Sequence, residues 1–320
     1  MPGRRRGQPE PAESGPALVL SPTRRFAVLA VAAPTCCRPL DLVPVLRSQP
    51  LPEDPTEAAS WMSQRLGQRV TCDLVNRRWR LFQLKKGHRF SNDDLFTAWR
   101  AALAHPSATR LLDLGCGIGS VGLSTLFKVG SPTATLVGIE AQEASHALLT
   151  ATLSFNGLAG RVTALHGDLR DLSLIRAEER FDLITGSPPY LPCDSGVLSN
   201  MPQKAACRIE LRGDVYDYCS TARYRLAPNG RFCFVMLAQD PRTEDAVRVN
   251  HMTILERWDY TFKPGRKPHI CTLVCAREED VAPDFEPVHG SMLIRDEAGD
   301  FTEEHFAFKR HMMEVCGFLS

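Results

Sequence analysis

A glycine-rich turn follows a short apolar segment near the middle of the chain. The chain reads LLDLGCGIG from Leu111 to Gly119, and apolar residues then recur at helical spacing. Glycine permits backbone angles and a close approach that a side chain would block, so a ligand can lie across the end of such a strand. The glycines follow D-x-G-x-G-x-G rather than the G-x-G-x-x-G of dinucleotide-binding turns. The spacing therefore speaks against NAD.

Acidic residues end or follow the next two apolar segments. Glu140 ends the segment that begins at Thr135, and Asp168 and Leu169 follow the segment Val162–His166. At Glu140 a carboxylate can accept hydrogen bonds from both hydroxyls of a ribose, while Asp168 can accept from an exocyclic amine and Leu169 can pack on an adenine ring. Taken singly, each acid is also explained as a helix N-terminal or loop residue. The ends of these parallel strands share one sheet edge, which favours a ligand site there.

The fourth apolar segment ends in Gly186 and the tetrapeptide Ser187-Pro188-Pro189-Tyr190. Two successive prolines lack backbone donors and fix their own φ angles, so the loop is stiff and presents carbonyl oxygens. An exocyclic amine is a poor nucleophile because its lone pair is delocalised. If the Ser187 hydroxyl and the Pro188 carbonyl accept its hydrogens, the nitrogen becomes pyramidal and faces an electrophile, and Tyr190 offers an aromatic face for a planar group.

The elements that would position these residues alternate between strand and helix. This order indicates an α/β fold with a mostly parallel sheet, helices on both faces and a terminal antiparallel hairpin, because Lys263-Pro264-Gly265-Arg266 is turn chemistry without room for a helix. The expected helices include 121–128, 142–155 and 215–224. Seven strands are expected, at 110–114, 135–139, 162–166, 181–185, 231–237, 253–262 and 269–276.

These motifs carry a resemblance. The glycine turn followed by a [N/S/D]-P-P-[Y/F] tetrapeptide resembles the class I S-adenosylmethionine-dependent methyltransferases, with a Rossmann-like fold, that modify amino groups. More specifically, WRLFQLKKGHRFSNDDL from Trp79 to Leu95 is similar to the start of the tRNA1(Val) adenine-37 N6-methyltransferase family. Further matches are ACRIE at 206–210 and LAPNGRF at 226–232. The resemblance covers roughly residues 75 to 277.

The resemblance implies S-adenosylmethionine as cofactor and adenine N6 in tRNA or another structured RNA as acceptor. Ser187 stands where the family usually has Asn, and Ser-Pro-Pro-Tyr also occurs among methyltransferases that act on cytosine N4. Two further functions stay open, protein glutamine N5-methylation and a non-catalytic RNA-binding module. By this resemblance Ser187, Pro188, Pro189 and Tyr190 would hold the acceptor, and the cofactor would contact Arg89, Phe90, Ser91, Asp93, Asp113, Gly115, Gly117, Gly119, Glu140, Asp168 and Leu169.

The charge is unevenly distributed along the chain. The 38 Lys and Arg nearly balance 37 Asp and Glu, and the formal net charge of +1 argues against a polyanionic partner. Residues 75–110, however, hold eight basic and two acidic residues, whereas residues 278–320 hold three basic and eleven acidic residues. We expect the basic stretch to contact RNA phosphates, with an edge strand protected by charge as the alternative. The predicted contacts are Arg77, Arg78, Arg80, Lys85 and Lys86, which alternate with Trp79 and Phe82.

Composition sets the domain limits. Eleven of 23 prolines fall between Pro2 and Pro55, which predicts a disordered extension over residues 1–60, followed by one catalytic domain over 61–278. Residues 279–320 are expected to form an acidic extension with a helix from Glu303 to Val315 docked on the core. The eleven dispersed cysteines indicate reduced thiols, and neither a metal site nor a membrane span is expected. We expect a soluble, intracellular monomer in the cytoplasm, with organelle import through the N-terminal extension as the alternative.

Overall fold

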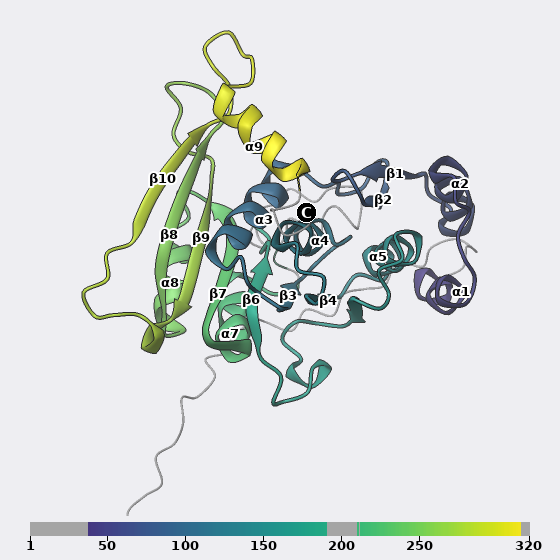
Figure 1. Ribbon diagram of the computed structural model, residues 1–320, viewed down its shortest axis with the longest axis horizontal. Helices are drawn as coiled ribbons and strands as arrows, with labels where there is room; N and C mark the ends of the chain where they lie inside the picture. The colour runs from purple at the N-terminus through teal and green to yellow at the C-terminus, as the bar shows by residue number, and fades with distance from the viewer. Residues whose placement is uncertain (1–37, 191–209, 211, 315–320) are drawn as a thin grey trace, which may run out of the picture.

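Eight strands form the central sheet of the computed structural model, in the order β10-β8-β9-β7-β6-β3-β4-β5 (Figure 1). The model describes residues 38–190, 210 and 212–314. The strands of this sheet are β3 Arg110–Leu114, β4 Thr135–Glu140, β5 Val162–His166, β6 Phe181–Gly186, β7 Leu226–Leu237, β8 Met252–Thr261, β9 Ile270–Arg277 and β10 Val288–Leu293. A separate antiparallel hairpin consists of β1 Val70–Leu74 and β2 Arg80–Leu84.

The sheet confirms the predicted α/β architecture. Strands β3 to β7 pair in parallel, and β9 is antiparallel to both β7 and β8, as the turn chemistry predicts. The prediction of seven strands is wrong by one, because β10 pairs in parallel with β8 and extends the edge of the sheet. The sequence of β10, VHGSML, lacks the apolar run that marks an inner strand, since an edge strand is largely exposed. All strands of the sheet except β9 therefore end at the same edge.

Helices cover both faces of the sheet. The bounds are α3 Asn92–Ala104, α4 Ser120–Val129 and α5 Glu143–Phe155 on one face, and α7 Val215–Arg225 and α8 Arg242–Val249 on the other. Neighbouring strand residues point to opposite cores: Leu111 packs toward α4 and α5, and Leu112 packs toward α7. Cys271 and Cys275, at an even spacing on β9, both lie buried in the core beneath α7 and α8, as core thiols do.

Two helices precede the hairpin, α1 Leu42–Ser48 and α2 Pro55–Leu66. The prediction of disorder through residue 60 is wrong for this part, because Leu46, Leu51 and Ala58 are buried in the core that includes α5. Proline density is a poor guide here, since proline is tolerated in the first turn of a helix. Pro55 begins α2, and the Asp54 side chain caps it by accepting from the backbone N–H groups of Thr56 and Glu57.

The C-terminal helix α9, Glu303–Met313, lies beside α3 (Figure 1). Phe308 and Met312 are buried against Phe96 of α3 and Tyr260 of β8. The buried Lys128 ammonium at the end of α4 donates to the carbonyl oxygens of His311 and Glu314, at 2.6 and 2.7 Å. The predicted end of this helix at Val315 falls outside the described residues. These contacts fix α3, whose first turn reaches the site described next.

Candidate active site

A cavity of about 790 Å³ opens at the edge where the parallel strands end. Its wall comes from the ends of β3, β4, β6 and β7, from the loop after β5, from the first turns of α3 and α4, and from the segment that precedes α3. Most of the residues predicted to bind cofactor or acceptor line this one cavity: Arg89, Phe90, Ser91, Asp93, Asp113, Gly115, Gly117, Glu140, Leu169, Ser187, Pro188, Pro189 and Tyr190.

Two predicted cofactor contacts, Gly119 and Asp168, do not line the cavity. Gly119 begins α4 with a φ of 89°, and a Cβ there would lie 2.7 Å from a methyl carbon of Leu149. Its role is close packing between α4 and α5. The Asp168 carboxylate is bound by Arg170, whose Nε and terminal nitrogen donate to its two oxygens at 2.9 and 2.5 Å. Sequence alone does not reveal this pairing, because an aspartate after a strand has the same local pattern whether or not an arginine binds it.

The glycine turn is held from below by Asp113. One oxygen of its buried carboxyl accepts from the Thr185 hydroxyl of β6 at 2.8 Å, and the other accepts from the backbone N–H of Gly122 in α4 at 2.9 Å. Gly117 has a φ of 56° and leaves open space where a Cβ would point. Asp113 thus links β3, β6 and α4 around the turn, and the turn offers bare backbone to the cavity.

Burial raises the pKa of Asp113 to about 7. Between its ordinary value and 7 the folded protein holds a proton that the unfolded chain has released, so this group's contribution to stability falls as pH rises through that window. Asp113→Asn lacks this titrating group. We therefore expect its free energy of unfolding, taken as the difference from wild type, to rise by about 2–3 kcal/mol from pH 5 to pH 8. Urea unfolding of both proteins at the two pH values measures this change. Equal pH dependence of the two proteins would contradict the assignment.

Glu140 ends β4 and reaches the turn from the other side. Its buried carboxylate accepts from the backbone N–H of Gly117 at 2.8 Å and from that of Gln142. Burial raises its pKa, and these donors and the Arg212 charge act in the opposite direction. Each carboxylate oxygen has more than one lone pair, so Glu140 can accept further hydrogen bonds from a ligand in the cavity.

The segment Gly87–Ser91 is fixed over the cavity by the β1–β2 hairpin. The Arg89 guanidinium binds Asp73 at 3.0 Å and donates to the Thr71 hydroxyl. Gln83 donates to the same Asp73 carboxylate and accepts from the backbone N–H of Phe90. The hairpin therefore positions the residues Arg89, Phe90 and Ser91, which were predicted from the sequence to contact the cofactor.

The tetrapeptide forms the wall opposite the glycine turn. The Ser187 hydroxyl oxygen is buried and has no hydrogen-bond partner among the described residues. A buried hydroxyl without a partner is costly, so its place in the cavity wall suits a ligand that supplies a donor. The Tyr190 hydroxyl donates to Asp93 of α3 at 3.5 Å, and burial raises the pKa of Tyr190 well above its ordinary value. The tyrosine is therefore a neutral, oriented ring.

The further residues that line the cavity and that the sequence did not indicate include Tyr218, Arg212 and His269. Tyr218 of α7 packs so closely that a Cβ on Gly115 would lie 2.1 Å from its hydroxyl, and a Cβ on Gly186 would lie 2.8 Å from its ring. This contact requires glycine at the ends of both β3 and β6. One terminal nitrogen of Arg212 is buried without a hydrogen-bond partner among the described residues. No local pattern marks these residues, because they reach the cavity from elements far along the chain.

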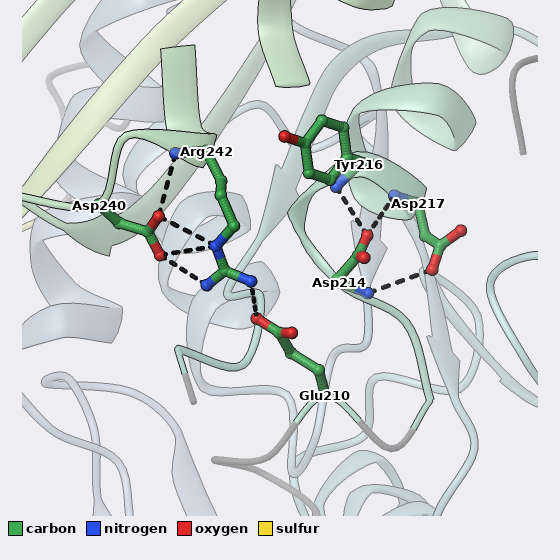
Figure 2. Close-up of polar contacts among 6 residues, drawn as sticks. All are labelled: Glu210, Asp214, Tyr216, Asp217, Asp240 and Arg242. Atoms are coloured by element: carbon green, nitrogen blue, oxygen red, sulfur yellow. Dashed lines mark hydrogen bonds and ion pairs between the residues drawn. The ribbon is translucent and has the colours of Figure 1, made fainter. Parts of the chain in front are cut away.

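Paired charges fix the chain beside the cavity, where it returns toward α7 (Figure 2). Arg242, at the start of α8, binds Asp240 through two nitrogens and Glu210 at 2.7 Å. Glu210 belongs to the ACRIE match, of which residues 206–209 lie outside the described residues. Asp214 then caps α7 by accepting from the backbone N–H groups of Tyr216 and Asp217. Arg212 lies between these two anchors.

The predicted RNA contacts separate into two groups. Lys85 and Lys86 are exposed and directly precede Gly87 at the cavity, and they line a smaller hollow of about 360 Å³ with Arg69 and Gln68. Arg77 and Arg78 are exposed at the opposite end of β2, while Arg80 donates to the carbonyl of Cys72. The intervening aromatics Trp79 and Phe82 are buried in the core and cannot stack on a base.

The described part of the chain shows neither a cluster of metal ligands nor a membrane-spanning helix. Within residues 38–190, 210 and 212–314 there is no group of three or more His, Cys, Asp or Glu residues that could hold a metal ion. In the same ranges no helix is long and apolar enough to cross a membrane.

The comparisons with known proteins agree with this geometry. The family model of the methyltransferase small domain matches residues 90–245. The tRNA1(Val) (adenine(37)-N6)-methyltransferase of Pasteurella multocida is 24% identical over 185 residues, which cover 58% of this chain and 73% of that protein. The release factor glutamine methyltransferase of Bordetella pertussis is 32% identical over 111 residues, 35% of this chain and 37% of that protein.

A further relative and a solved structure extend the comparison. The ribosomal RNA small subunit methyltransferase H of Bifidobacterium adolescentis is 34% identical over 83 residues, so the chain spans only 23% of its length. A predicted O-methyltransferase from Agrobacterium tumefaciens shares the fold, with a TM-score of 0.50 and 15% identity over 70% of this chain and 97% of that one. The family match, the relatives and the fold together support a class I S-adenosylmethionine-dependent methyltransferase, with S-adenosylmethionine as its cofactor.

Proposed function

We propose that the enzyme methylates the N6 amine of adenine in tRNA. The observation that carries this proposal is the buried Ser187 hydroxyl, which has no hydrogen-bond partner in the described part of the chain and begins the stiff Pro-Pro loop in the cavity wall. A hydroxyl in this position can accept a hydrogen from an exocyclic amine, together with the Pro188 carbonyl. Tyr190, next in the same wall, offers the planar face that a base unstacked from RNA requires.

The opposite wall suits the cofactor. Glu140 has lone pairs left for the two ribose hydroxyls, and the bare backbone of the turn at Gly115 and Gly117 allows close approach. Leu169 offers an apolar surface to the adenine ring, and Arg89 to Ser91 with Asp93 would cover the ligand. The cavity volume, about 790 Å³, falls in the range of small-molecule and cofactor sites.

Catalysis would depend on orientation. S-adenosylmethionine supplies a methyl group that its positive sulfur already activates. The residues of the tetrapeptide hold the amine so that its lone pair faces the methyl carbon. With the cofactor bound, the held amine nitrogen would take the methyl group directly, the electrons of the carbon–sulfur bond would pass to the leaving sulfur, and the nitrogen would then release a proton. Positioning of this kind, rather than a nucleophilic side chain, can account for a large rate acceleration.

The relatives support an RNA acceptor and define two further candidates. The match to the Pasteurella multocida tRNA1(Val) (adenine(37)-N6)-methyltransferase covers 58% of this chain. The match to the release factor glutamine methyltransferase covers 35%. Both amide and base amines present the same hydrogens to Ser187, so protein glutamine N5 is the second candidate. Cytosine N4 is the third, because Ser187 replaces the usual Asn.

The modified nucleosides of cellular RNA test the assignment. RNA from cells with and without this protein is digested to nucleosides and measured by mass spectrometry. Loss of N6-methyladenosine from one tRNA in the deletion strain is the expected result. Loss of N4-methylcytidine instead would transfer the proposal to cytosine, and an unchanged nucleoside profile would contradict an RNA acceptor.

Reversing the charges beside the cavity should weaken RNA binding. We expect Lys85→Glu with Lys86→Glu to raise KM for tRNA about tenfold at ~0.1 M salt, because both cations would otherwise neutralise phosphates. Steady-state kinetics at several salt concentrations measure the effect. The matched control reverses Arg176 and Arg248, which are exposed at the opposite edge of the sheet. An equal rise in KM for both pairs, or methylation that does not depend on salt, would contradict a phosphate contact at Lys85 and Lys86.

A further inference from the structure

The loop between β8 and β9 is strongly basic and lies at the same sheet edge as the cavity. It reads FKPGRKPH from Phe262 to His269 and contains no acidic residue. Because β8 runs parallel to β7 and β6, its carboxyl end comes to the edge where those strands end. The last loop residue, His269, lines the cavity together with Leu237 and Tyr190. Three cations, Lys263, Arg266 and Lys267, therefore lie within a few residues of the cavity wall.

The loop holds its cations outward. Lys263, Arg266 and Lys267 are all exposed, and none forms an ion pair with another described residue. The turn itself is closed by the Arg266 N–H, which donates to the Lys263 carbonyl, with Gly265 at a φ of 68°. At the base of the loop, His269 donates its N–H to Tyr260 and accepts from Ala238. Pro264 and Pro268 restrict the backbone further, so little conformational entropy is lost when an anion binds.

Four acids near this edge are paired with arginines. Arg242 binds both Asp240 and Glu210 (Figure 2), and Arg257 binds Asp259 and Glu244. Asp296, Glu297 and Asp300 form no ion pair with a described residue and lie in the turn after β10, the strand that flanks β8 on the outer side of the sheet. In the order of the sheet, the basic loop thus lies between the cavity and this acidic turn.

Two basic loops approach the cavity from different elements. In the chain, Lys85 and Lys86 precede His88, and the cations of the β8–β9 loop precede His269. Both histidines line the cavity and lie close enough to Asp93 for their charges to lower the pKa of its carboxyl. We propose that the β8–β9 loop is a second phosphate-binding element, which holds the RNA backbone on the side of the cavity opposite Lys85 and Lys86. This inference rests on the proposed RNA acceptor. A backbone held on both sides would fix the unstacked base between the two loops, over Tyr190.

The test compares two triple variants in binding unfractionated tRNA. One replaces Lys263, Arg266 and Lys267 by alanine, and the control replaces Arg110, Arg176 and Arg248 at the opposite edge, so both lose three positive charges. We expect the loop variant to bind tRNA about tenfold or more weakly at ~0.1 M salt. Its plot of log affinity against log salt should also be shallower by about 2 to 3. S-adenosylmethionine affinity, measured by calorimetry, should stay unchanged in both variants.

The outcomes separate this inference from the proposed function. If wild-type enzyme binds and methylates tRNA and both triple variants retain its affinity and salt slope, the loop inference is wrong and the proposed function stands. An equal loss of tRNA affinity in both variants, or a loop variant that also loses cofactor affinity, overturns the inference too, because the effect would then be general charge or structural damage. If the wild-type enzyme neither binds nor methylates tRNA, both proposals fail.

Discussion

Glu140→Gln is expected to lower the affinity for S-adenosylmethionine about 100-fold. The carboxylate already orders the turn through Gly117, and it would also accept the two ribose hydroxyls. Hydrogen bonds to a charged acceptor contribute about 1.5–3 kcal/mol each, and about 3 kcal/mol corresponds to 100-fold in dissociation constant. An amide keeps the size of the side chain but replaces one acceptor by a donor, which would face the backbone N–H of either Gly117 or Gln142. Titration calorimetry measures the affinity directly.

Glu143→Gln provides the matched control for this experiment. It makes the same chemical change three residues later, in the first turn of α5, at a position that does not line the cavity. We expect this variant to bind the cofactor as wild type does. Equal affinity of the Glu140 and Glu143 variants, at equal unfolding temperatures, would show that the carboxylate at the end of β4 does not hold the ribose.

Tyr190→Ala is expected to lower kcat/KM for tRNA about 10- to 100-fold and to leave cofactor affinity close to wild type. Stacking of a base on an aromatic ring contributes about 1–3 kcal/mol, and the alanine variant would lose both this surface and the orientation of the amine. Methyl transfer to tRNA under single-turnover conditions, with cofactor affinity measured separately, distinguishes the two effects.

Tyr190→Phe is the companion variant, because it keeps the ring and removes only the hydroxyl that donates to Asp93 at 3.5 Å. We expect its kcat/KM to stay within about threefold of wild type, since the long hydrogen bond contributes little. If the phenylalanine variant were as impaired as the alanine variant, the hydroxyl rather than the ring would be the important group, and the stacking role would be wrong.

Sequence alone predicted the parts of the fold and site that depend on local patterns. Apolar runs placed strands β3 to β9, and the glycine turn and the Pro-Pro tetrapeptide each lie within a few residues, so their place in the cavity wall followed from the sheet. The edge strand β10 was missed as a member of the sheet because exposure leaves it without an apolar run. Helix α1 and the start of α2 were missed because prolines in first turns resemble prolines in disordered segments.

Contacts between distant elements could not be read in the same way. Tyr218 reaches the glycine turn from α7, yet it has no distinctive neighbourhood in the sequence. The pairing of Asp168 with Arg170 is local, but an arginine two residues after an aspartate does not by itself indicate an ion pair. The basic residues after residue 75 were predicted to form one RNA-binding patch, but strand β2 places Arg77 and Arg78 at one of its ends and Lys85 and Lys86 at the other. Trp79 and Phe82 face the core and only Lys85 and Lys86 adjoin the cavity, so the patch depends on strand geometry rather than on composition.

Methyl transfer by the purified protein tests the central claim most directly. The enzyme is incubated with S-adenosylmethionine labelled in the methyl group and with unfractionated tRNA, and the RNA is digested and separated into nucleosides. We predict that the label elutes with N6-methyladenosine and that Ser187→Ala greatly reduces it. Label in N4-methylcytidine, label in protein glutamine, or no label in RNA would contradict the assignment of adenine N6 as the acceptor.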